Sequence, residues 1–575
     1  MSPANQEALS VLALDIGTVH TRALLFDVVE ETYHFIAAGI APSTQKSPLN
    51  DVILGVLDAI RQLQKLSGRI ILNQQNNLIV PSLAGGEGID RFYITYSVGK
   101  PMRLATFALM SDVSHQSVNR LAATTPGLLV ESIHLNDSRT IHDQIDAVLQ
   151  ARPDLILFAG GTDRGASRSV KKMAGLIGAI LQLIPQGQRP PVVFSGNQLL
   201  TKQVKEALDS LTQFTGTANV RPEMDSEELD QASEELARLV TTLQTAEIDG
   251  LKRLEPLSSD APCPSATAIG RITRFLSKVG DPEKGVLSID LGASTTITAS
   301  ALAGKLDLNV FPVGSAYGFE RFLQATSMSE IAQWLPAGIP LEEARDQVWQ
   351  KTLFPTTLPL THAALTVEQA AYRQLLRYIM RELETRGVLL ENGYETILCS
   401  GAALTQAGSP MQLLLMLLDG LQPRGLTSLI LDSHSILSTL GAIARTLPLL
   451  PVQVLESASF TNLATVVSAS GSLRAGSLAL QARLEYASGK VREVKVKQDT
   501  LAVLPLRTGE TATLELNLNR LVQVEAAELA DNRFKVNGGL CGLVIDARGR
   551  PLQLPANAAR REELLQRWNA MLNSK

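Results

Sequence analysis

Two copies of one short pattern place a carboxylate, a glycine and several hydroxyl groups where a buried strand turns back on itself. The copies occupy residues 11–22 and 286–297, which lie 275 positions apart. Each begins with an apolar run typical of a buried strand, and a second apolar strand follows the turn. An internal repeat of this kind indicates a duplicated structural unit. The matching residues are Asp15 with Asp290, Gly17 with Gly292, and Thr21 with Thr296.

Such a turn has the chemistry of a phosphate site. Glycine lets the backbone approach a phosphate closely, and N–H and hydroxyl groups then donate to its oxygens. A strand-end aspartate can hold Mg²⁺ through water, because this ion keeps much of its hydration shell. Asp-x-Gly alone is a common turn, but two facing hairpins would clamp both ends of a polyphosphate. We assign Asp15 and Asp290 as candidate catalytic and metal-binding residues. The candidate phosphate-binding residues are Gly17, Thr18, Thr21, Arg22, Gly292, Ser294, Thr295 and Thr296.

The strands that must position these turns continue beyond each copy. Residues 33–41 are predicted to form a third strand after the first copy, and residues 305–314 a third strand after the second. The duplicated hairpin resembles the phosphate-1 and phosphate-2 pair of the actin-like ATPase superfamily, which includes sugar kinases, heat-shock chaperones and actin. Residues 397–403 look like the small-residue turn that packs on adenosine there, and residues 429–442 look like the closing helix with its Gly-Ala pair.

This resemblance implies a two-lobed α/β protein that binds ATP with Mg²⁺. It places Ser400, Gly401 and Ala402 beside the nucleoside. The motifs follow in the superfamily's order across residues 11–445.

A Gly-rich segment at residues 155–165 resembles a motif of one particular family within this superfamily. It contains Ala159-Gly-Gly-Thr-Asp163, which looks like the AGGTD signature of the glutamate mutase L (MutL/GlmL) family. Three further segments fit that family in order, so that the similarity covers about residues 11–450. These segments are 192–197, 219–222 and 264–268.

The resemblance implies an ATP-using chaperone that reactivates an adenosylcobalamin-dependent mutase such as glutamate mutase. The partner would therefore be such a mutase. The sequence lacks Asp-x-His-x-x-Gly, the cobalamin ligand motif of the mutase's own domain. We therefore expect that this chain does not carry cobalamin itself.

Three positions depart from the superfamily pattern or leave its chemistry open. Ile297 stands where a second acid usually follows the threonine pair, and isoleucine cannot orient a water or a metal. Glu87 is a speculative replacement acid. Arg22 either pairs with a phosphate or is a solvent-facing strand residue. Nucleotide binding is therefore expected, while hydrolysis is left open and the chain is classed only as a candidate ATPase.

Composition excludes several other classes. The 575 residues allow roughly three to four domains at about 150 residues each. The net charge of −5 argues against a nucleic-acid partner, because phosphate backbones attract concentrated Lys and Arg. No apolar run is long enough for a membrane span, and the polar start does not resemble a signal peptide, so we expect a cytoplasmic protein. The cysteines, Cys263, Cys399 and Cys541, lie too far apart in sequence to suggest a metal or disulfide framework.

The remaining segments complete the predicted architecture. Between about residues 105 and 251, strands alternate with helices, which indicates an inserted doubly wound α/β domain. Its strands are predicted at 127–133, 155–158 and 192–195, and its helices at 140–151, 167–183, 199–211 and 223–245. A small basic cluster beside its Gly-rich loop is either a solvated helix start or a contact for a partner or phosphate. It consists of Arg164, Arg168, Lys171 and Lys172.

After residue 450 the pattern changes to period-two alternation, which predicts an all-β sandwich or barrel. A closing amphipathic helix is expected over residues 557–572. The predicted fold is thus a duplicated actin-like (ribonuclease-H-like) two-lobed core with an inserted doubly wound domain and a C-terminal all-β domain. The predicted domains are 1–104 (first lobe), 105–284 (insert), 285–450 (second lobe) and 451–575 (β domain with terminal helix).

Three functions remain in competition. The first is the ATP-driven reactivating chaperone. The second is a nucleotide-binding scaffold of the actin-like assembly type without significant turnover, and self-association is left open. The third, a small-molecule kinase, ranks last because no convincing carboxylate base for a substrate hydroxyl stands out.

Overall fold

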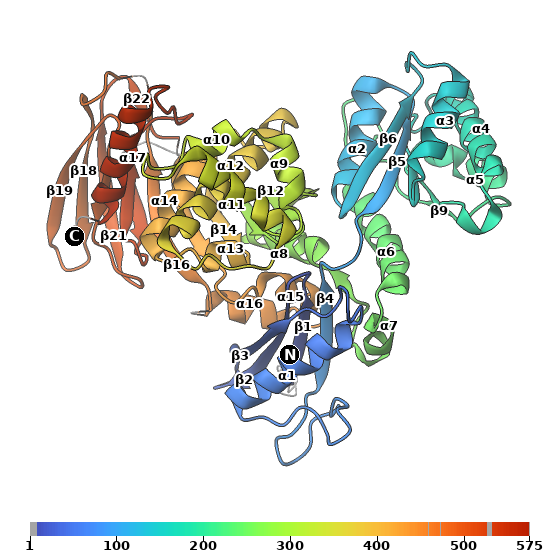
Figure 1. The fold of residues 1–575 in the computed structure, drawn as a ribbon, viewed down its shortest axis with the longest axis horizontal. Coiled ribbons are helices and arrows are strands. Elements are labelled where there is room, and N and C mark those ends of the chain that lie inside the picture. The colour runs from blue at the N-terminus through green and yellow to red at the C-terminus, as the bar shows by residue number, and fades with distance from the viewer. Residues whose placement is uncertain (1–8, 458, 472, 526–531, 574–575) are drawn as a thin grey trace, which may run out of the picture.

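The computed structural model describes residues 9–457, 459–471, 473–525 and 532–573. Figure 1 traces the chain from a first lobe (blue) through an insert (cyan to green) and a second lobe (yellow) to C-terminal strands (orange and red). The insert and the C-terminal strands lie at opposite ends of the molecule. The predicted fold class is confirmed: two α/β lobes, a doubly wound insert and a C-terminal all-β region.

The first lobe is built on a five-stranded sheet with the order β10-β4-β1-β2-β3. Helix α1 (Val52–Ser67) covers one face, while α15 (Leu437–Ile443) and α16 (Leu449–Glu456) cover the other. Because both faces are covered, β1 is buried along its whole length, and Asp15 is its one polar residue. The strands are β1 Val11–Ile16, β2 His20–Val29, β3 Thr32–Pro42, β4 Arg91–Tyr96 and β10 Cys263–Pro264.

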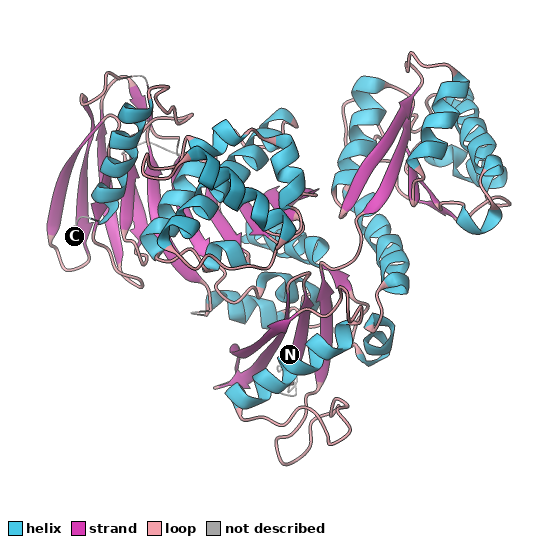
Figure 2. Ribbon diagram, in the orientation of Figure 1, coloured by secondary structure: helices cyan, strands magenta, loops and turns pink. Residues whose placement is uncertain are grey.

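The second lobe repeats the antiparallel β-hairpin and third strand of the first. Its sheet has the order β13-β12-β11-β14-β15-β16-β24-β20. One face packs on α8 (Ser265–Val279) and α15, and the other on a group of helices that includes α11, α12 and α14. Figure 2 shows these helices in front of the central strands. The elements are β11 Gly285–Leu291, β12 Thr296–Leu302, β13 Lys305–Phe311, α9 Phe319–Ala325, α10 Met328–Ala332, α11 Leu341–Leu353, α12 His362–Thr385, β14 Tyr394–Ser400, α13 Ala402–Thr405, α14 Pro410–Leu421 and β15 Gly425–Leu431.

The C-terminal strands extend this sheet and then cover it. β16 (Thr461–Ser468) pairs with β15, so the sheet of the second lobe continues into the chain beyond the predicted boundary at residue 450. A second sheet, ordered β19-β18-β21-β23, packs on that extension as the other half of a sandwich. The remaining elements are β18 Leu478–Tyr486, β19 Val491–Lys497, β20 Leu501–Leu504, β21 Thr511–Leu518, β23 Arg533–Asn537, β24 Leu543–Asp546 and α17 Ala558–Asn573.

The insert is a five-stranded parallel sheet with the order β6-β5-β7-β8-β9. Helices α3, α4 and α5 cover one face, and α2 and α6 cover the other. The elements are β5 Met102–Ala108, α2 Gln116–Ala123, β6 Gly127–His134, α3 Ile141–Ala151, β7 Leu155–Phe158, α4 Ser167–Leu183, β8 Val192–Phe194, α5 Thr201–Leu208, β9 Phe214–Gly216 and α6 Asp230–Glu247.

Two helices of the insert differ in extent from the sequence prediction. α5 ends at Leu208, before the predicted residue 211. α6 begins at Asp230 instead of residue 223. The segment before it is held in a non-helical course, because the Glu227 carboxylate forms ion pairs with Arg120 at 2.6 Å and with Arg221 at 3.7 Å.

A buried charge network ties the C-terminal sandwich to the second lobe. The Arg548 guanidinium is fully buried and lies 2.6 Å from Asp419 of α14 and 2.8 Å from Asp546 of β24. It also lies over the ring of Trp568 in α17, 4.6 Å from the ring centre. Burial opposes the charged form of Asp546, but Arg548 and Arg550 more than offset it and hold the pKa of this carboxyl well below its usual range. One side chain therefore links α14, β24 and α17.

Replacing Arg548 with methionine should strongly destabilise the chain. Removal of one partner from a buried ion pair leaves uncompensated charge and costs about 3–5 kcal/mol. We expect the Arg548→Met variant to unfold at a markedly lower urea concentration, as measured by tryptophan fluorescence. The matched control is Arg492→Met on the exposed part of β19. An equal, small shift for both variants would contradict this role of Arg548.

Candidate active site

Two glycine turns from different lobes form the floor of one cavity. In each hairpin the aspartate is the next-to-last residue of its strand, and the glycine follows the strand end. A Cβ atom at Gly17 would lie 2.8 Å from the His20 carbonyl oxygen, and one at Gly292 would lie 2.7 Å from that of Thr295. Both turns are too tight for any other residue without displacement of the backbone.

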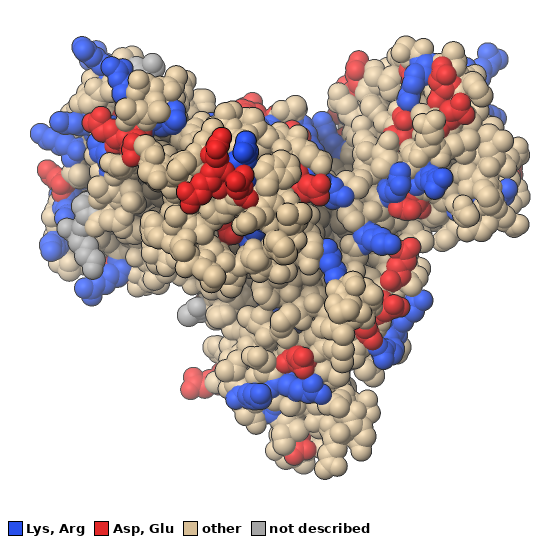
Figure 3. Space-filling view, in the orientation of Figure 1, with Lys and Arg blue, Asp and Glu red and all other residues tan. Residues whose placement is uncertain are grey.

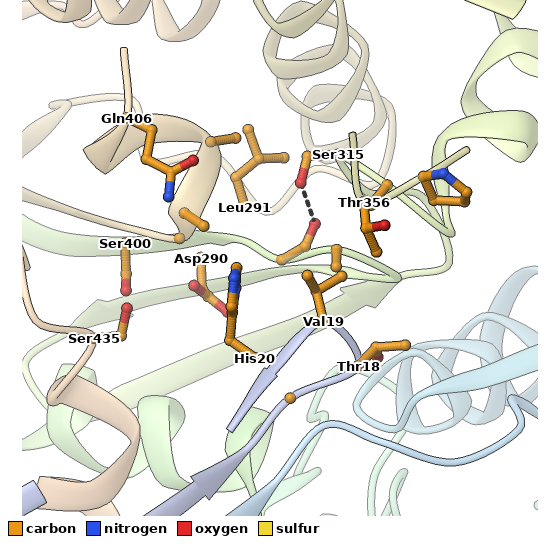
Figure 4. A pocket seen from close by; sticks show the side chains of 18 of the residues that line it. Thr18, Val19, His20, Asp290, Leu291, Ser315, Thr356, Ser400, Gln406 and Ser435 are labelled. Carbon is orange, nitrogen blue, oxygen red and sulfur yellow. Dashed lines mark hydrogen bonds between the residues drawn. The ribbon is translucent and has the colours of Figure 1, made fainter. Parts of the chain in front are cut away.

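The two turns contact each other directly. The Ser294 hydroxyl donates to the Thr18 hydroxyl at 3.0 Å, which joins the two lobes at the base of the cavity. The cavity has a volume of about 490 Å³ and is bordered by both hairpins. Figure 4 shows Thr18, Val19 and His20 of one hairpin facing Asp290 and Leu291 of the other. Among the described residues, the backbone N–H groups of Thr18, Val19, Ala293 and Ser294 donate to no protein acceptor.

A third turn closes the cavity beside the second hairpin. β14 lies parallel to β11, and Ser400 is the register neighbour of Asp290. Gly401 follows with φ of 111° and begins the short helix α13. A Cβ atom at Gly401 would lie 2.3 Å from the Leu291 carbonyl oxygen, so the close packing of these two turns requires glycine. Ser400, Gly401 and Ala402 all line the cavity.

The two hairpin aspartates differ in their cross-strand neighbours. Asp15 lies opposite Arg22, whose guanidinium is 3.1 Å from the carboxylate, and the Thr95 hydroxyl donates to it at 3.1 Å. Asp290 lies opposite Ile297 in the equivalent register, and Ile297 is buried in the apolar core. The duplicated unit thus supplies a cation to one carboxylate and none to the other.

A third carboxylate lies behind this pair. Asp432 follows β15 and is fully buried, and it accepts hydrogen bonds from the backbone N–H groups of Ile436 and Leu437 at the start of α15. Ser400 donates to it at 3.4 Å. Burial raises the pKa of Asp432, although the two backbone hydrogen bonds oppose the shift. We did not assign Asp432 to the site from sequence; its position at a strand end, like that of Asp15 and Asp290, was the available signal.

Negative charge is therefore concentrated around one arginine. Burial, followed by the charge of Asp15, raises the pKa of Asp290 to about 7, while Arg22 opposes the shift and Asp432 adds to it. A cation beside Asp15 and Asp290 would relieve this repulsion. Among the described residues, no group of three or more His, Cys, Asp or Glu side chains could hold a metal ion. Two carboxylates suit an ion such as Mg²⁺, which retains several water ligands.

The structure brings most of the predicted site residues to the cavity. Thr21 and Thr296 do not line it, because both are fully buried, and the Thr296 hydroxyl donates to the Val313 carbonyl at 2.9 Å. Thr295 and Ser294 are also absent from the lining, although Ser294 contacts Thr18. The residues that line the cavity as predicted are Asp15, Gly17, Thr18, Arg22, Asp290, Gly292, Ser400, Gly401 and Ala402.

The far end of the cavity comes from helices that carried no functional signal in the sequence. The Lys351 ammonium of α11 lies 3.0 Å from the Glu368 carboxylate of α12, and the Tyr372 hydroxyl donates to the same carboxylate at 3.1 Å. All three side chains line the cavity. They form a polar wall away from the hairpins, together with Gln369 and Gln406.

Two other motifs lie elsewhere. Glu87 is not among the residues that line the cavity. The Gly-rich loop at residues 159–165 belongs to the insert, where the Asp163 carboxylate accepts from the Gln198 backbone N–H and from the Asn219 side chain, both at 3.0 Å. Asp163 therefore fixes neighbouring loops of the insert to one another.

The asymmetry of the two aspartates predicts a pH effect on stability without nucleotide or metal. Asp290 binds a proton more tightly in the folded chain, with a pKa of about 7, than in the unfolded chain, where it is about 3.9. The free energy of unfolding should therefore fall as pH rises through this window. We expect Asp290→Asn to melt close to wild type at pH 5 and at a higher temperature than wild type at pH 8, as measured by calorimetry with EDTA present.

The matched control is Asp15→Asn. This change removes the partner of Arg22, so it should lower the melting temperature at both pH values. A constant difference between Asp290→Asn and wild type from pH 5 to pH 8 would show that Asp290 does not titrate in this range.

Comparison with known proteins gives one family match. The model of a family described as MutL protein matches residues 11–459. No curated protein matches the sequence. None of the helices in the described ranges is both long and apolar enough to cross a membrane.

Solved structures give distant matches. A glycerol dehydratase reactivase is 12% identical, with 71% of this chain and 94% of that chain covered and a TM-score of 0.27. A structure of the PilM–PilN type IV pilus biogenesis complex is 12% identical, covering 77% and 97%, with a TM-score of 0.26. The xylulose kinase from Bifidobacterium adolescentis is 11% identical, covering 78% and 93%, with a TM-score of 0.27.

Proposed function

Because the chain belongs to the MutL protein family, we propose that it binds Mg-ATP between its lobes and acts as a reactivating chaperone of an adenosylcobalamin-dependent mutase such as glutamate mutase. The observation that carries the nucleotide part is the meeting of two Asp-x-Gly hairpins, one from each lobe, at a single cavity. The proposed mutase partner rests on the family match, because the glutamate mutase L family that the sequence resembles is grouped with adenosylcobalamin-dependent mutases.

The chain's own groups would divide the work of holding the nucleotide. The unpaired backbone N–H groups at Thr18, Val19, Ala293 and Ser294 are suited to phosphate oxygens. The tight turn at Gly401 and Ala402 would lie against the nucleoside. Asp15 and Asp290 would hold Mg²⁺ through water, and that ion would neutralise phosphate charge when bound.

In this proposal the Arg22 guanidinium can pair either with Asp15 or with a phosphate. It contacts Asp15 at 3.1 Å in the structure, and it lines the same cavity as the hairpin turns. A phosphate near the turn would compete with Asp15 for the guanidinium. Phosphate binding would thus change the contact between Arg22 and Asp15 in the first hairpin.

Turnover should be slow in the isolated chain. The position after the threonine pair of the second hairpin is Ile297, which is buried in the core and offers no polar atom to a water. Asp290 remains the carboxylate of that hairpin at the cavity. We therefore propose that ATP mainly shifts the balance between lobe arrangements, and that a client binds these arrangements with different affinity.

Alanine substitutions of the two aspartates should each weaken Mg-ATP binding about tenfold or more. A contact to a charged group contributes about 1.5–3 kcal/mol, which corresponds to at least a tenfold change in the dissociation constant. Isothermal titration of Asp15→Ala and Asp290→Ala would measure this effect. The matched control is Asp346→Ala on the exposed face of α11. Wild-type affinity in both site variants would refute the clamp.

The client role requires a separate assay. A purified adenosylcobalamin-dependent mutase loaded with cyanocobalamin would be incubated with this protein, free adenosylcobalamin and Mg-ATP. We expect recovery of mutase activity that depends on ATP and fails with Asp290→Ala. If the protein binds ATP but mutase activity does not recover, the chaperone role is refuted while the proposed nucleotide site is still supported.

The second candidate function is a nucleotide-dependent scaffold, and the buried Ile297 favours it. A protein of this type binds ATP but assembles instead of turning it over. Light scattering on addition of Mg-ATP distinguishes the two functions, because the scaffold predicts growth of large particles and the chaperone does not.

A further inference from the structure

The outer face of the insert carries an unusual run of positive charge. Residues 164–205 contain seven Lys and Arg residues and no Asp or Glu, in a chain whose net charge is −5. Arg189 has a structural role, since it donates to the carbonyl oxygens of Ile184 and Leu211. The other six side chains are exposed. They are Arg164, Arg168, Lys171, Lys172, Lys202 and Lys205.

The fold gathers these six side chains at one edge. α4 follows β7, α5 follows β8, and both strands are parallel, so the two helices begin at the same edge of the sheet. The two helices also pack against each other. Arg168, Lys171 and Lys172 belong to the first two turns of α4, and Lys202 and Lys205 to those of α5. We call this set, with Arg164, the basic face.

The basic face breaks two rules of helix stability. Cations near a helix N-terminus oppose the helix dipole, yet Arg168 lies in the first turn of α4, which has no acid there. Lys202 lies in the first turn of α5, whereas Lys205 lies in its last turn, where a cation suits the dipole. Arg168 also lies three and four residues before Lys171 and Lys172, where like charges repel. In the same domain, α3 begins with a complete capping box formed by Thr140 and Asp143. The insert therefore uses stabilising chemistry at the start of α3 and omits it at the start of α4.

The six cations of the basic face are not neutralised by ion pairs among the described residues. The nearest candidate in the sequence, Asp163, accepts hydrogen bonds from Gln198 and Asn219. Glu206 and Asp209 lie four residues after Lys202 and Lys205, so the two lysines of α5 have an acid one helical turn away. Arg168, Lys171 and Lys172 of α4 have no acid within four residues on either side. On the face drawn in Figure 3, by contrast, red and blue side chains are mixed over the central helices.

Exposed apolar side chains lie at the same edge of the sheet as the basic face. Leu199, just before α5, is 69% exposed, and Met110 in the loop after β5 at the same sheet edge is 49% exposed. Methionine and arginine are enriched at protein–protein interfaces, so Met110, Arg164 and Arg168 suit a protein partner. A nucleic-acid surface would instead combine cations with exposed aromatic rings for base stacking, and residues 164–205 contain Phe194 as their one aromatic residue, which is buried.

We propose that the basic face is a docking surface for an acidic protein partner, with the exposed Leu199 as an apolar contact beside it. The cations at the start of α4 oppose their own helix dipole and form no ion pair with any described residue, so an external acidic surface is what balances them. Local rules broken without internal compensation mark a functional surface. The proposal does not depend on the nucleotide site or on the identity of the client.

The test uses charge reversal in the full-length chain. Arg168→Glu with Lys172→Glu reverses two cations of the basic face. The matched control, Lys495→Glu with Lys497→Glu, makes the same change of charge on exposed positions of β19. The probe is a fluorescein-labelled polyglutamate peptide, followed by anisotropy over a range of NaCl concentrations, with oligothymidylate and phosphatidylserine vesicles as competitors.

We expect wild type and the control to bind the peptide with an affinity that falls as salt rises, and the basic-face variant to bind at least tenfold more weakly. The basic-face variant should also melt at a higher temperature than wild type, since the new acids suit the helix N-termini. Equal peptide affinity in the three proteins would overturn the proposal. Preferential displacement by oligothymidylate or by vesicles would assign the face to nucleic acid or to membrane instead.

A lower melting temperature for the basic-face variant would also overturn the proposal, because it would show that the cations serve folding. Mg-ATP affinity is measured on the same samples and should be equal in all three. If the wild-type protein fails to bind ATP, the proposed nucleotide site is rejected, but the comparison of peptide affinities still tests the basic face.

Discussion

Unbalanced negative charge between the lobes is the constraint around which this molecule is organised. Three carboxylates, Asp15, Asp290 and Asp432, approach one another at the ends of strands from both lobes, and Arg22 is the cation that faces them. Such a cluster is costly in the empty protein, because burial and repulsion both disfavour charge. A cation bound beside the carboxylates, as proposed for Mg²⁺, would supply positive charge and lower this cost. The stability of the lobe interface is thus linked to what occupies the cavity.

The backbone geometry that holds these carboxylates together depends on small residues. Gly401 lies against the Leu291 carbonyl, and Gly441 of α15 lies so close to α8 that a Cβ atom there would be 1.9 Å from the Ala268 carbonyl oxygen. α8 and α15 pack between the two sheets, and apolar residues from both lobes join in one cluster around them. The separation of the lobes is therefore set by direct backbone contacts, which tolerate little change. A ligand that bridges the hairpins would therefore act on a lobe interface that allows few intermediate arrangements of the two lobes.

Much of this arrangement followed from the sequence, and the exceptions have physical causes. The internal repeat was sufficient to predict the facing aspartates, since a duplicated hairpin places equivalent residues at equivalent positions. Thr21 and Thr296 were assigned to the phosphates on residue type alone. Their register neighbours are Ile16 and Leu291, which are buried, and side chains opposite each other in a sheet share a face. Strand alternation could therefore have excluded both threonines.

The far wall of the cavity was beyond sequence reasoning. Lys351 and Glu368 lie on helices whose periodicity indicates which face is buried, but periodicity does not reveal which other element that face meets. The same holds for Arg548, whose partners Asp419 and Trp568 are separated from it along the chain. The alternating strands after residue 450 predicted a β-sandwich or barrel, and the structure has two packed sheets. They could not show that one half of it continues the sheet of the second lobe.

That continuity determines how motion would spread through the molecule. β15 pairs with β16, β16 pairs with β24, and Arg548 joins β24 to α14, so the sandwich must move with the second lobe. The insert is attached differently. Its chain leaves the first lobe after β4 and returns through Ile248 and Leu251, which are buried in the core of the first lobe. Helix α2 of the insert also packs on β13 of the second lobe. The insert therefore contacts both lobes, and a rotation between the lobes would have to shift the contact between α2 and β13.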